Sequence, residues 1–275
     1  MLLATIVHAG EESAAIVDPA AGRVWPLGIG MLELIAAGTE HAAEGAGLLQ
    51  EAVELCAPIP RPRRNIFCVG KNYREHAAEM EAGEALPEAP ILFSKVPETV
   101  IAPGAPIPLP RGVSEAIDYE AELAVVIGRG GRGIGRAEAM DHVFGFTIVN
   151  DVTARDVQRR HQQWLLGKSF DGFCPMGPWI ATRDAIDLAR TRVRLWINGE
   201  PRQDATTADL IFDVPTLIET VSAGITLYPG DVIATGTPAG VGAGFRPPRY
   251  LRTGDRVAIE IDGIGRLENP VEGRG

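Results

Sequence analysis

The sequence has little of several features that mark common classes of protein. Only three of its 275 residues are cysteines, an odd number without the spacing of a metal site, so we expect reduced thiols and a cytoplasmic location. No apolar run is long enough to span a bilayer, and the N-terminus lacks the basic region and long apolar core of a signal peptide. The net charge of −10 disfavours nucleic acid as a partner, because binding phosphates requires positive charge.

The composition is otherwise that of an ordinary globular protein, with a hydrophobic fraction of 45% and enough length to bury a large core. Residues 1–25 favour a small hairpin, and residues 30–56 show a helical spacing of apolar side chains. Three prolines at alternate positions within residues 58–62 then make a stiff, extended connector. We therefore predict a small α+β N-terminal domain over residues 1–60 and a second domain over residues 61–275.

Short apolar runs separated by glycine and proline turns dominate the chain from residue 65 onward. Two of these stretches, at residues 193–199 and 254–267, contain the Asn-Gly and Asp-Gly pairs that are typical of hairpin turns. An aspartate is placed to cap a helix over residues 213–221. This pattern predicts a second domain that is mainly β with a few helices, and an α+β chain as a whole.

Two acidic side chains lie within a predicted strand at residues 117–127. Side chains alternate faces along a strand, so Glu120 and Glu122 share one face, about 7 Å apart. Two carboxylates this close repel each other unless a cation lies between them. A second apolar run ends in Asp151, and the three acids form an all-oxygen set that suits Mg²⁺, Mn²⁺ or Ca²⁺ rather than zinc. The alternative is that Glu120 and Glu122 face solvent on an edge strand, which the spacing alone leaves open.

A predicted helical turn at residues 71–80 carries a histidine and a glutamate on one face. His76 and Glu79 are three residues apart, which is the spacing of neighbours on a helix surface. A carboxylate beside an imidazole raises its basicity and fixes its orientation, as a general base requires. An ordinary pair on the protein surface is the alternative. Residues 81–90, rich in Glu, Ala, Gly and Pro, are typical of a mobile loop and consistent with a lid.

Lys168 stands among apolar neighbours in a turn-rich stretch that we expect to form a long loop over residues 167–178. A partly buried ammonium there would stabilise a developing oxyanion, whereas a lysine that snorkels to the surface would have no such role. Farther along, the glycine-rich turn at residues 235–242 offers backbone amides that could hold a carboxylate. Arg246 and Arg249 would either meet a second carboxylate of the substrate or stay solvated.

Two further patterns are set aside on physical grounds. Residues 128–133 match the G-x-G-x-x-G pattern of dinucleotide-binding proteins, but the strand of such a site is buried on both faces and apolar throughout. The strand here carries Glu120 and Glu122, so we expect a glycine-rich hairpin loop instead. Cys68 and Cys174 lie in apolar contexts without an evident activating base, which disfavours catalysis by cysteine.

Five motifs in order make the chain resemble the fumarylacetoacetate hydrolase family over about residues 60–272. They are Gly-Lys-Asn-Tyr at 70–73, Asp-Tyr-Glu-Ala-Glu at 118–122, Asn-Asp-Val-Thr-Ala-Arg-Asp at 150–156, Gly-Lys-Ser-Phe-Asp at 167–171 and Thr-Gly-Thr-Pro-Ala-Gly-Val-Gly at 235–242. The resemblance is to the bacterial acylpyruvase and 2-hydroxyhepta-2,4-diene-1,7-dioate isomerase-like group. It implies a mixed β-roll that carries the active site, usually in a homodimer, with a small variable N-terminal domain.

Carried over residue by residue, the resemblance implies three sets of site residues: metal ligands, catalytic groups, and groups that hold the carboxylate and oxo groups of the substrate. They are, in that order, Glu120, Glu122 and Asp151; His76, Glu79 and Lys168; and Arg155, Gln158 and Thr237. In hydrolytic members of the family the His–Glu dyad activates water, and the lysine stabilises an enolate or oxyanion.

The chemistry that this resemblance implies acts on 2-oxo acids and 1,3-dicarbonyl compounds. Two adjacent oxygens of such a substrate chelate the metal, which acts as a Lewis acid. We therefore expect a Mg²⁺- or Mn²⁺-dependent hydrolase, with Ca²⁺ as a possible substitute, that cleaves a C–C bond of an acylpyruvate-like compound in the catabolism of aromatic compounds. The alternatives are isomerisation of hydroxymuconate-type dienes, decarboxylation of an oxo acid such as oxaloacetate, and a non-catalytic module that binds a metal or ligand.

Overall fold

The structure is a computed structural model that describes residues 1–38, 42–80 and 85–274. Its largest feature is a mixed sheet of twelve strands in the order β4-β3-β2-β1-β14-β12-β11-β17-β6-β7, with β5 paired to β1 and β8 to β14. The strands of this sheet are β1 (Leu2–His8), β2 (Glu11–Asp18), β3 (Arg23–Pro26), β4 (Leu48–Leu49), β5 (Glu54–Leu55), β6 (Ile66–Gly70), β7 (Ile91–Lys95), β8 (Val100–Ile101), β11 (Ala121–Ile127), β12 (Val143–Asn150), β14 (Cys174–Thr182) and β17 (Val232–Ala234).

Two smaller sheets complete the β structure. A sheet of five strands has the order β16-β15-β18-β19-β9, and a sheet of two strands pairs β10 with β13. Their strands are β9 (Ile107–Pro110), β10 (Ile117–Asp118), β13 (Thr153–Ala154), β15 (Arg192–Ile197), β16 (Glu200–Thr206), β18 (Arg256–Ile261) and β19 (Gly265–Arg274).

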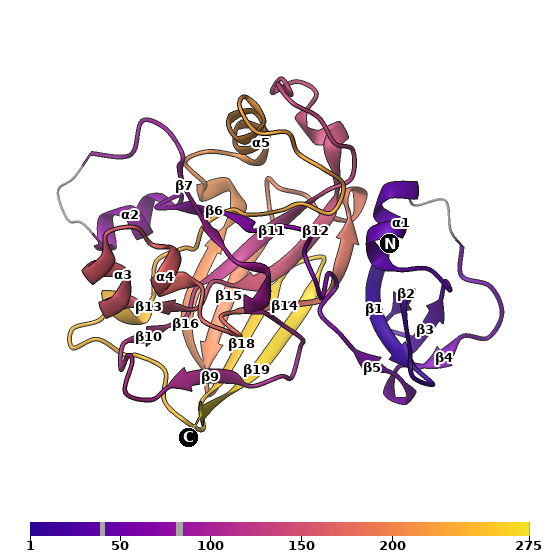
Figure 1. Cartoon of the computed structure of the whole chain (residues 1–275), viewed down its shortest axis with the longest axis horizontal. Coiled ribbons are helices and arrows are strands. Elements are labelled where there is room, and N and C mark those ends of the chain that lie inside the picture. The colour runs from indigo at the N-terminus through magenta and orange to yellow at the C-terminus, as the bar shows by residue number, and fades with distance from the viewer. Residues whose placement is uncertain (39–41, 81–84, 275) are drawn as a thin grey trace.

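The helices are short and lie around the sheets. They are α1 (Met31–Ala37), α2 (Arg74–Met80), α3 (Arg155–His161), α4 (Leu165–Lys168) and α5 (Val214–Ser222). Figure 1 shows α2, α3 and α4 grouped on one side of the molecule, away from the indigo N-terminal strands on the other side. None of the helices within the described ranges is long and apolar enough to cross a membrane.

The core lies on both faces of the neighbouring strands β11, β12 and β14, whose residues are all buried. Alternation along β11 sends Leu123 and Val125 into one apolar cluster, together with side chains of the five-stranded sheet such as Ile259. Ala124 and Val126 enter a second cluster on the opposite face, which includes residues of α1. A strand that packs on both faces has no solvent side, so a polar side chain in it must find its partner inside the protein.

Most of the expected elements are present. The chain is mainly β, as predicted, and the hairpins at 193–199 and 254–267 and the helix capped by Asp213 are confirmed. The antiparallel pairing of β11 with β12 also confirms a loop at residues 128–133 that joins two antiparallel strands, which is not the connection of a dinucleotide-binding unit.

Two expectations about local structure are wrong. Helix α1 ends at Ala37, and described residues farther along the predicted helix at 30–56 form short strands and turns instead. Gly38, Gly45 and Gly47 all have positive φ angles, which a helix cannot accommodate. The predicted loop at 167–178 is also shorter, because α4 ends at Lys168 and the strand β14 begins at Cys174. Burial of the apolar side chains favours a strand here more strongly than the glycine and proline residues favour a loop.

Several predictions remain open at the level of architecture. The N-terminal strands are continuous with the large sheet, because Leu2 and Leu3 of β1 pair with Ala181 and Ile180 of β14. The domain boundary near residue 60, the β-roll and the homodimer stay predictions. Part of the predicted lid, residues 81–84, lies outside the described residues, and residues 85–90 contain neither helix nor strand.

The cap of α5 gives a test of the fold. Asp213 accepts a hydrogen bond from the backbone amide of Thr216 at 3.0 Å and pairs with the exposed Arg136. We expect Asp213→Ala to lower the free energy of unfolding by about 1 kcal/mol relative to Asp213→Ser. Both variants lose the pair with Arg136, but only serine keeps a capping oxygen. Chemical denaturation measures the difference, and equal stability of the two variants would contradict the role of the cap.

Candidate active site

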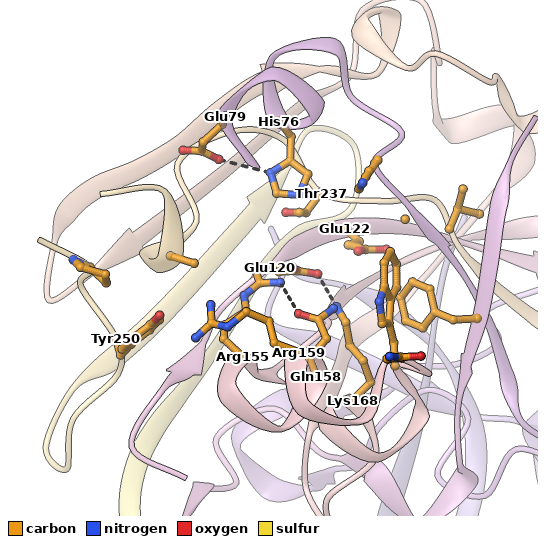
Figure 2. A pocket seen from close by; sticks show the side chains of 18 of the residues that line it. His76, Glu79, Glu120, Glu122, Arg155, Gln158, Arg159, Lys168, Thr237 and Tyr250 are labelled. Atoms are coloured by element: carbon orange, nitrogen blue, oxygen red, sulfur yellow. Dashed lines mark hydrogen bonds and ion pairs between the residues drawn. The ribbon is translucent and has the colours of Figure 1, made fainter. Parts of the chain in front are cut away.

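A cavity of about 500 Å³ opens between α2, α3, α4 and the start of β11. Eight of the nine predicted site residues line it, namely His76, Glu79, Glu120, Glu122, Arg155, Gln158, Lys168 and Thr237. Figure 2 shows His76 and Glu79 on one side of this pocket, facing Glu120, Glu122 and Lys168 on the other. The ninth residue, Asp151, is not in the lining, but it forms an ion pair with Lys168 at 2.6 Å.

The three predicted metal ligands converge because of the register of two strands. Ala121 of β11 pairs with Asn150 of β12, and the amide of Asp151 donates to the carbonyl of Glu120 at 2.9 Å. One carboxylate oxygen from each of Glu120, Glu122 and Asp151 can be chosen so that all lie within 4.8 Å of one another. Their exposed fractions are 4%, 1% and 0%, so the alternative of a solvent-facing edge strand is wrong.

Buried cations surround these carboxylates. Lys168 Nζ lies 2.7 Å from Glu120 Oε2 and 2.6 Å from Asp151 Oδ2, so the alternative of a snorkelling surface lysine is wrong. Lys95 Nζ, also fully buried, lies 2.7 Å from Asp151 Oδ1 and donates to the carbonyls of Val152 and Lys168. Each lysine therefore fixes one oxygen of Asp151.

Arg155 links the same cluster to the helix α3. Its Nε donates to Asp118 Oδ2 at 2.8 Å, its Nη2 to Glu120 Oε1 at 2.5 Å, and its Nη1 to Gln158 Oε1 at 3.3 Å. Thr237 is similarly engaged, since its Oγ1 accepts from Gln203 Nε2 at 2.8 Å. The guanidinium of Arg155 thus clamps protein carboxylates, and it reaches a substrate only at its edge.

The charges of the cluster are unevenly balanced. Burial alone would raise the pKa of Glu120, but Lys168 and Arg155 outweigh this and lower it to about 2. Burial would likewise lower the pKa of Lys168, yet Asp151 and Glu120 raise it, so this amine stays protonated. The pKa of Glu122 is raised well above its usual range by burial and by Asp151 and Glu120.

Glu122 is the carboxylate that the neighbouring cations leave uncompensated. Its Oε2 accepts a hydrogen bond from the amide of Gly236 at 2.8 Å, and no ion pair to it is found in the described part of the chain. Together with Asp118, the cluster holds four buried carboxylates against the three cations Lys95, Lys168 and Arg155, counted over the residues that the structure describes. This excess of negative charge and the all-oxygen donor set fit a hard divalent cation held by Glu120, Glu122 and Asp151.

The pair of His76 and Glu79 is held in the wall of the pocket by other parts of the protein. His76 Nδ1 lies 3.2 Å from Glu79 Oε2, and the side chain of His76 is only 7% exposed, so the alternative of an ordinary surface pair is wrong. Glu79 Oε1 accepts from the amide of Gly240 at 3.0 Å, and a β-carbon at Gly244 would overlap this carboxylate. With Nδ1 occupied by a carboxylate, Nε2 is the nitrogen left to exchange a proton.

The glycine-rich turn binds carboxylates, as expected, but they belong to the protein. The amides of Gly236, Gly240 and Gly242 donate to Glu122, Glu79 and Asp118, respectively. Successive amides in glycine-rich turns form a concave site for an anion, which explains this arrangement. The turn therefore orients both the dyad and the cluster of buried carboxylates.

Two functional neighbours were missed in the sequence. Asp118 is fully buried and accepts hydrogen bonds from Arg155 and from the amides of Gly242 and Ala243. Lys95 lies at the end of the strand β7, next to the site. Both residues could have been found from the sequence, because each is a charged residue at the end of an apolar run. A charge at such a position is costly to bury without a partner.

Removal of the uncompensated carboxylate tests the metal site. Loss of a residue that only supports a metal ligand weakens metal binding roughly 10- to 100-fold. Because Glu122→Gln removes a ligand itself, we expect it to weaken binding of Mn²⁺ by more than this. Isothermal titration calorimetry measures the affinity. The matched control is Glu115→Gln, which changes an exposed glutamate and should bind Mn²⁺ like the wild type. Unchanged affinity in Glu122→Gln would refute the assignment of this ligand.

The cysteines give a second test. Burial raises the pKa of Cys174 to about 12 and that of Cys68 well above its usual range, whereas Cys56 is partly exposed. We expect one thiol per native chain to react with a disulfide reagent at pH 8, and Cys56→Ser to abolish that reaction. Rapid modification of Cys68 or Cys174 in the folded protein would contradict their inert, buried environment.

Comparison with known proteins places this geometry in a family. Residues 65–272 match the fumarylacetoacetate (FAA) hydrolase C-terminal family. The chain is 52% identical over 220 residues to the oxaloacetate tautomerase YisK of Bacillus subtilis. These residues make up 80% of this chain and 73% of that protein.

Solved structures support the same family assignment. A fumarylacetoacetate hydrolase from the psychrophile Exiguobacterium antarcticum superposes with a TM-score of 0.89 at 42% identity, over 100% of both chains. A 2-hydroxyhepta-2,4-diene-1,7-dioate isomerase from Mycobacterium marinum superposes with a TM-score of 0.81 at 36% identity, over 100% of this chain and 99% of that one. The matched residues cover all five motifs and the whole pocket. The chain therefore belongs to the fumarylacetoacetate hydrolase family of enzymes.

Proposed function

We propose that this enzyme catalyses the keto–enol tautomerisation of a 2-oxo acid, with oxaloacetate as the best candidate substrate. The observation that supports it most is the position of the His76–Glu79 dyad across the pocket from the cluster of Glu120, Glu122 and Asp151 (Figure 2). Tautomerisation needs a base near one carbon and a stabilised oxygen beside it, and these two groups supply both. The similarity to the oxaloacetate tautomerase of Bacillus subtilis points to the same reaction.

Proton transfer would be the task of the dyad. The carboxylate of Glu79 holds Nδ1 of His76, so Nε2 takes the proton from the carbon next to the carbonyl. The electron pair of that C–H bond then forms the C=C bond, the carbonyl oxygen takes the negative charge, and this oxygen afterwards takes a proton from solvent while His76 returns its own to solvent. A divalent ion, Mg²⁺ or Mn²⁺, when bound by the three acids supplies Lewis-acid polarisation of the carbonyl.

Lys168 would stabilise the charge that develops on the substrate oxygen. Its pKa is raised by Asp151 and Glu120, so it serves as a cation and not as a base. It lies 4.9 Å from the centroid of the Phe93 ring, which limits access of water to the amine on that side. Arg155 and Gln158 would hold the carboxylate of the substrate with their remaining donors.

Hydrolysis of an acylpyruvate is the second candidate. The similarity to the fumarylacetoacetate hydrolase from Exiguobacterium antarcticum favours it, and the same dyad would then orient an attacking water. Isomerisation of a diene diacid and decarboxylation of oxaloacetate need the same stabilised enolate. The cytoplasmic location and the homodimer remain predictions from the sequence.

The decisive assay follows the enol-to-keto conversion of oxaloacetate by ultraviolet absorbance with Mg²⁺ or Mn²⁺ present. We expect the enzyme to accelerate it, His76→Asn to lower kcat roughly 10²- to 10⁴-fold, and chelation of the metal to lower it as well. The control is His8→Asn, an exposed residue outside the pocket, which should react at the wild-type rate.

The same samples are then given acylpyruvates and diene diacids, with products identified by mass spectrometry. Faster turnover of an acylpyruvate than of oxaloacetate would replace tautomerisation with hydrolysis. Tight metal binding without turnover of any of these compounds would favour a binding module. Wild-type rates in His76→Asn would remove the dyad from the mechanism.

A further inference from the structure

The mouth of the pocket carries an arginine that has no partner among the residues that the structure describes. Arg159 lines the cavity and is exposed, and it makes no hydrogen bond or ion pair with any residue that the structure describes. By contrast, Arg155 on the same helix is buried and engages Asp118, Glu120 and Gln158. A guanidinium without an anion at a pocket is an available site for a carboxylate, which it can bind through two parallel hydrogen bonds.

The position of Arg159 separates it from the metal-binding end of the pocket. It follows Arg155 by four residues, so the two side chains leave the same face of α3 about 6 Å apart along the helix axis. Burial decreases in the same direction, from the buried Arg155 through the half-buried Gln158 to the exposed Arg159. Figure 2 shows these three residues on one helical segment below Glu120.

The distribution of charge fixes which part of a substrate each end can take. The inner end already contains four buried carboxylates, so it accepts the 2-oxo acid end of a substrate only through the cations there. A second, distal carboxylate would be repelled from this cluster. At the mouth, by contrast, the guanidinium of Arg159 forms no ion pair with an acidic side chain of the described residues, and it is exposed.

We propose that Arg159 binds the distal carboxylate of a 2-oxo diacid and thereby selects diacids over monoacids of the same length. This rests on the proposed function, because the 2-oxo acid end must occupy the metal-binding end of the pocket. Arg159 is then a specificity-determining residue, and proton transfer by His76 does not depend on it.

The other arginines near the mouth are less suited to this task. Arg249, one of two candidates from the sequence, pairs with Glu200 at 2.8 Å and is absent from the lining of the pocket. Arg246 lines the pocket, but its Nη1 donates to the carbonyls of Ala243 and Phe245. Arg159 could also serve only to stabilise α3, because a positive charge near the C-terminal end of a helix is favourable. The adjacent Arg160 provides the same charge.

The test compares oxaloacetate with 2-oxobutyrate, which has the same carbon chain and lacks the distal carboxylate. Keto–enol conversion is followed by absorbance for the diacid, and by exchange of the C3 hydrogens in D₂O for the monoacid. We expect Arg159→Gln to raise KM for oxaloacetate roughly 10- to 100-fold with kcat changed less than about threefold, and to leave KM for 2-oxobutyrate unchanged. Arg159→Lys should recover part of the loss.

The matched control is Arg160→Gln, which removes the neighbouring charge from the same helix end outside the pocket. Equal effects of Arg159→Gln and Arg160→Gln, or equal losses for both substrates, would overturn the proposal. A rise in KM for oxaloacetate in Arg246→Gln, without one in Arg159→Gln, would overturn it too.

Calorimetry separates this proposal from the proposed function. If the wild type accelerates neither reaction, the proposed function fails, and the Kd values of oxaloacetate and 2-oxobutyrate for the Mn²⁺-loaded protein still report on Arg159. Weaker binding of oxaloacetate alone in Arg159→Gln supports the role of this residue. Unchanged binding of both compounds contradicts it.

Discussion

The balance of charge inside one buried cluster is the constraint on which the rest of this structure depends. Its members come from four segments of the chain, near residues 95, 118–122, 151–155 and 168: Lys95, Asp118, Glu120, Glu122, Asp151, Arg155 and Lys168. Breaking a buried ion pair by removing one partner costs about 3–5 kcal/mol, because the remaining charge stays buried and unpaired. The strands β7, β10 and β11, the helices α3 and α4, and the connecting residues Glu120 and Asp151 therefore meet at one place, where their charges pair.

The same cluster gives the site its chemical character. Within the described residues it holds one more carboxylate than cations, and the pKa of Glu122 is raised by burial and by its acidic neighbours. A divalent cation relieves that excess and reverses the sign of the local field, which then favours an anionic substrate. The glycine-rich turn connects this cluster to the dyad, because its amides hold Glu122 and Glu79 from one segment. The proposed metal site and the proposed base are thus positioned by the same loop.

Local patterns in the sequence predict much of this structure, and partners distant in sequence set the rest. Alternation along residues 117–127 identifies Glu120 and Glu122, although the predicted strand is interrupted between Asp118 of β10 and Ala121 of β11, and five ordered motifs identify the pocket. The burial of Lys95 was not predictable from its strand, because its partners, Asp151 and two carbonyls, come from other segments. The extent of α1 was overestimated, since apolar spacing does not report the positive φ angles of the glycines that follow. The engagement of Arg155 with protein carboxylates likewise appears only in three dimensions.

The central claim is that three carboxylates share one hard cation at the inner end of the pocket. Diffraction from crystals grown with Mn²⁺ tests it most directly, because anomalous scattering locates the ion independently of the protein atoms. The account predicts one strong anomalous peak within coordination distance of Glu120, Glu122 and Asp151. A fully occupied Mn²⁺ position elsewhere in the protein, with those three side chains bound only to water and to Lys95 and Lys168, would contradict it.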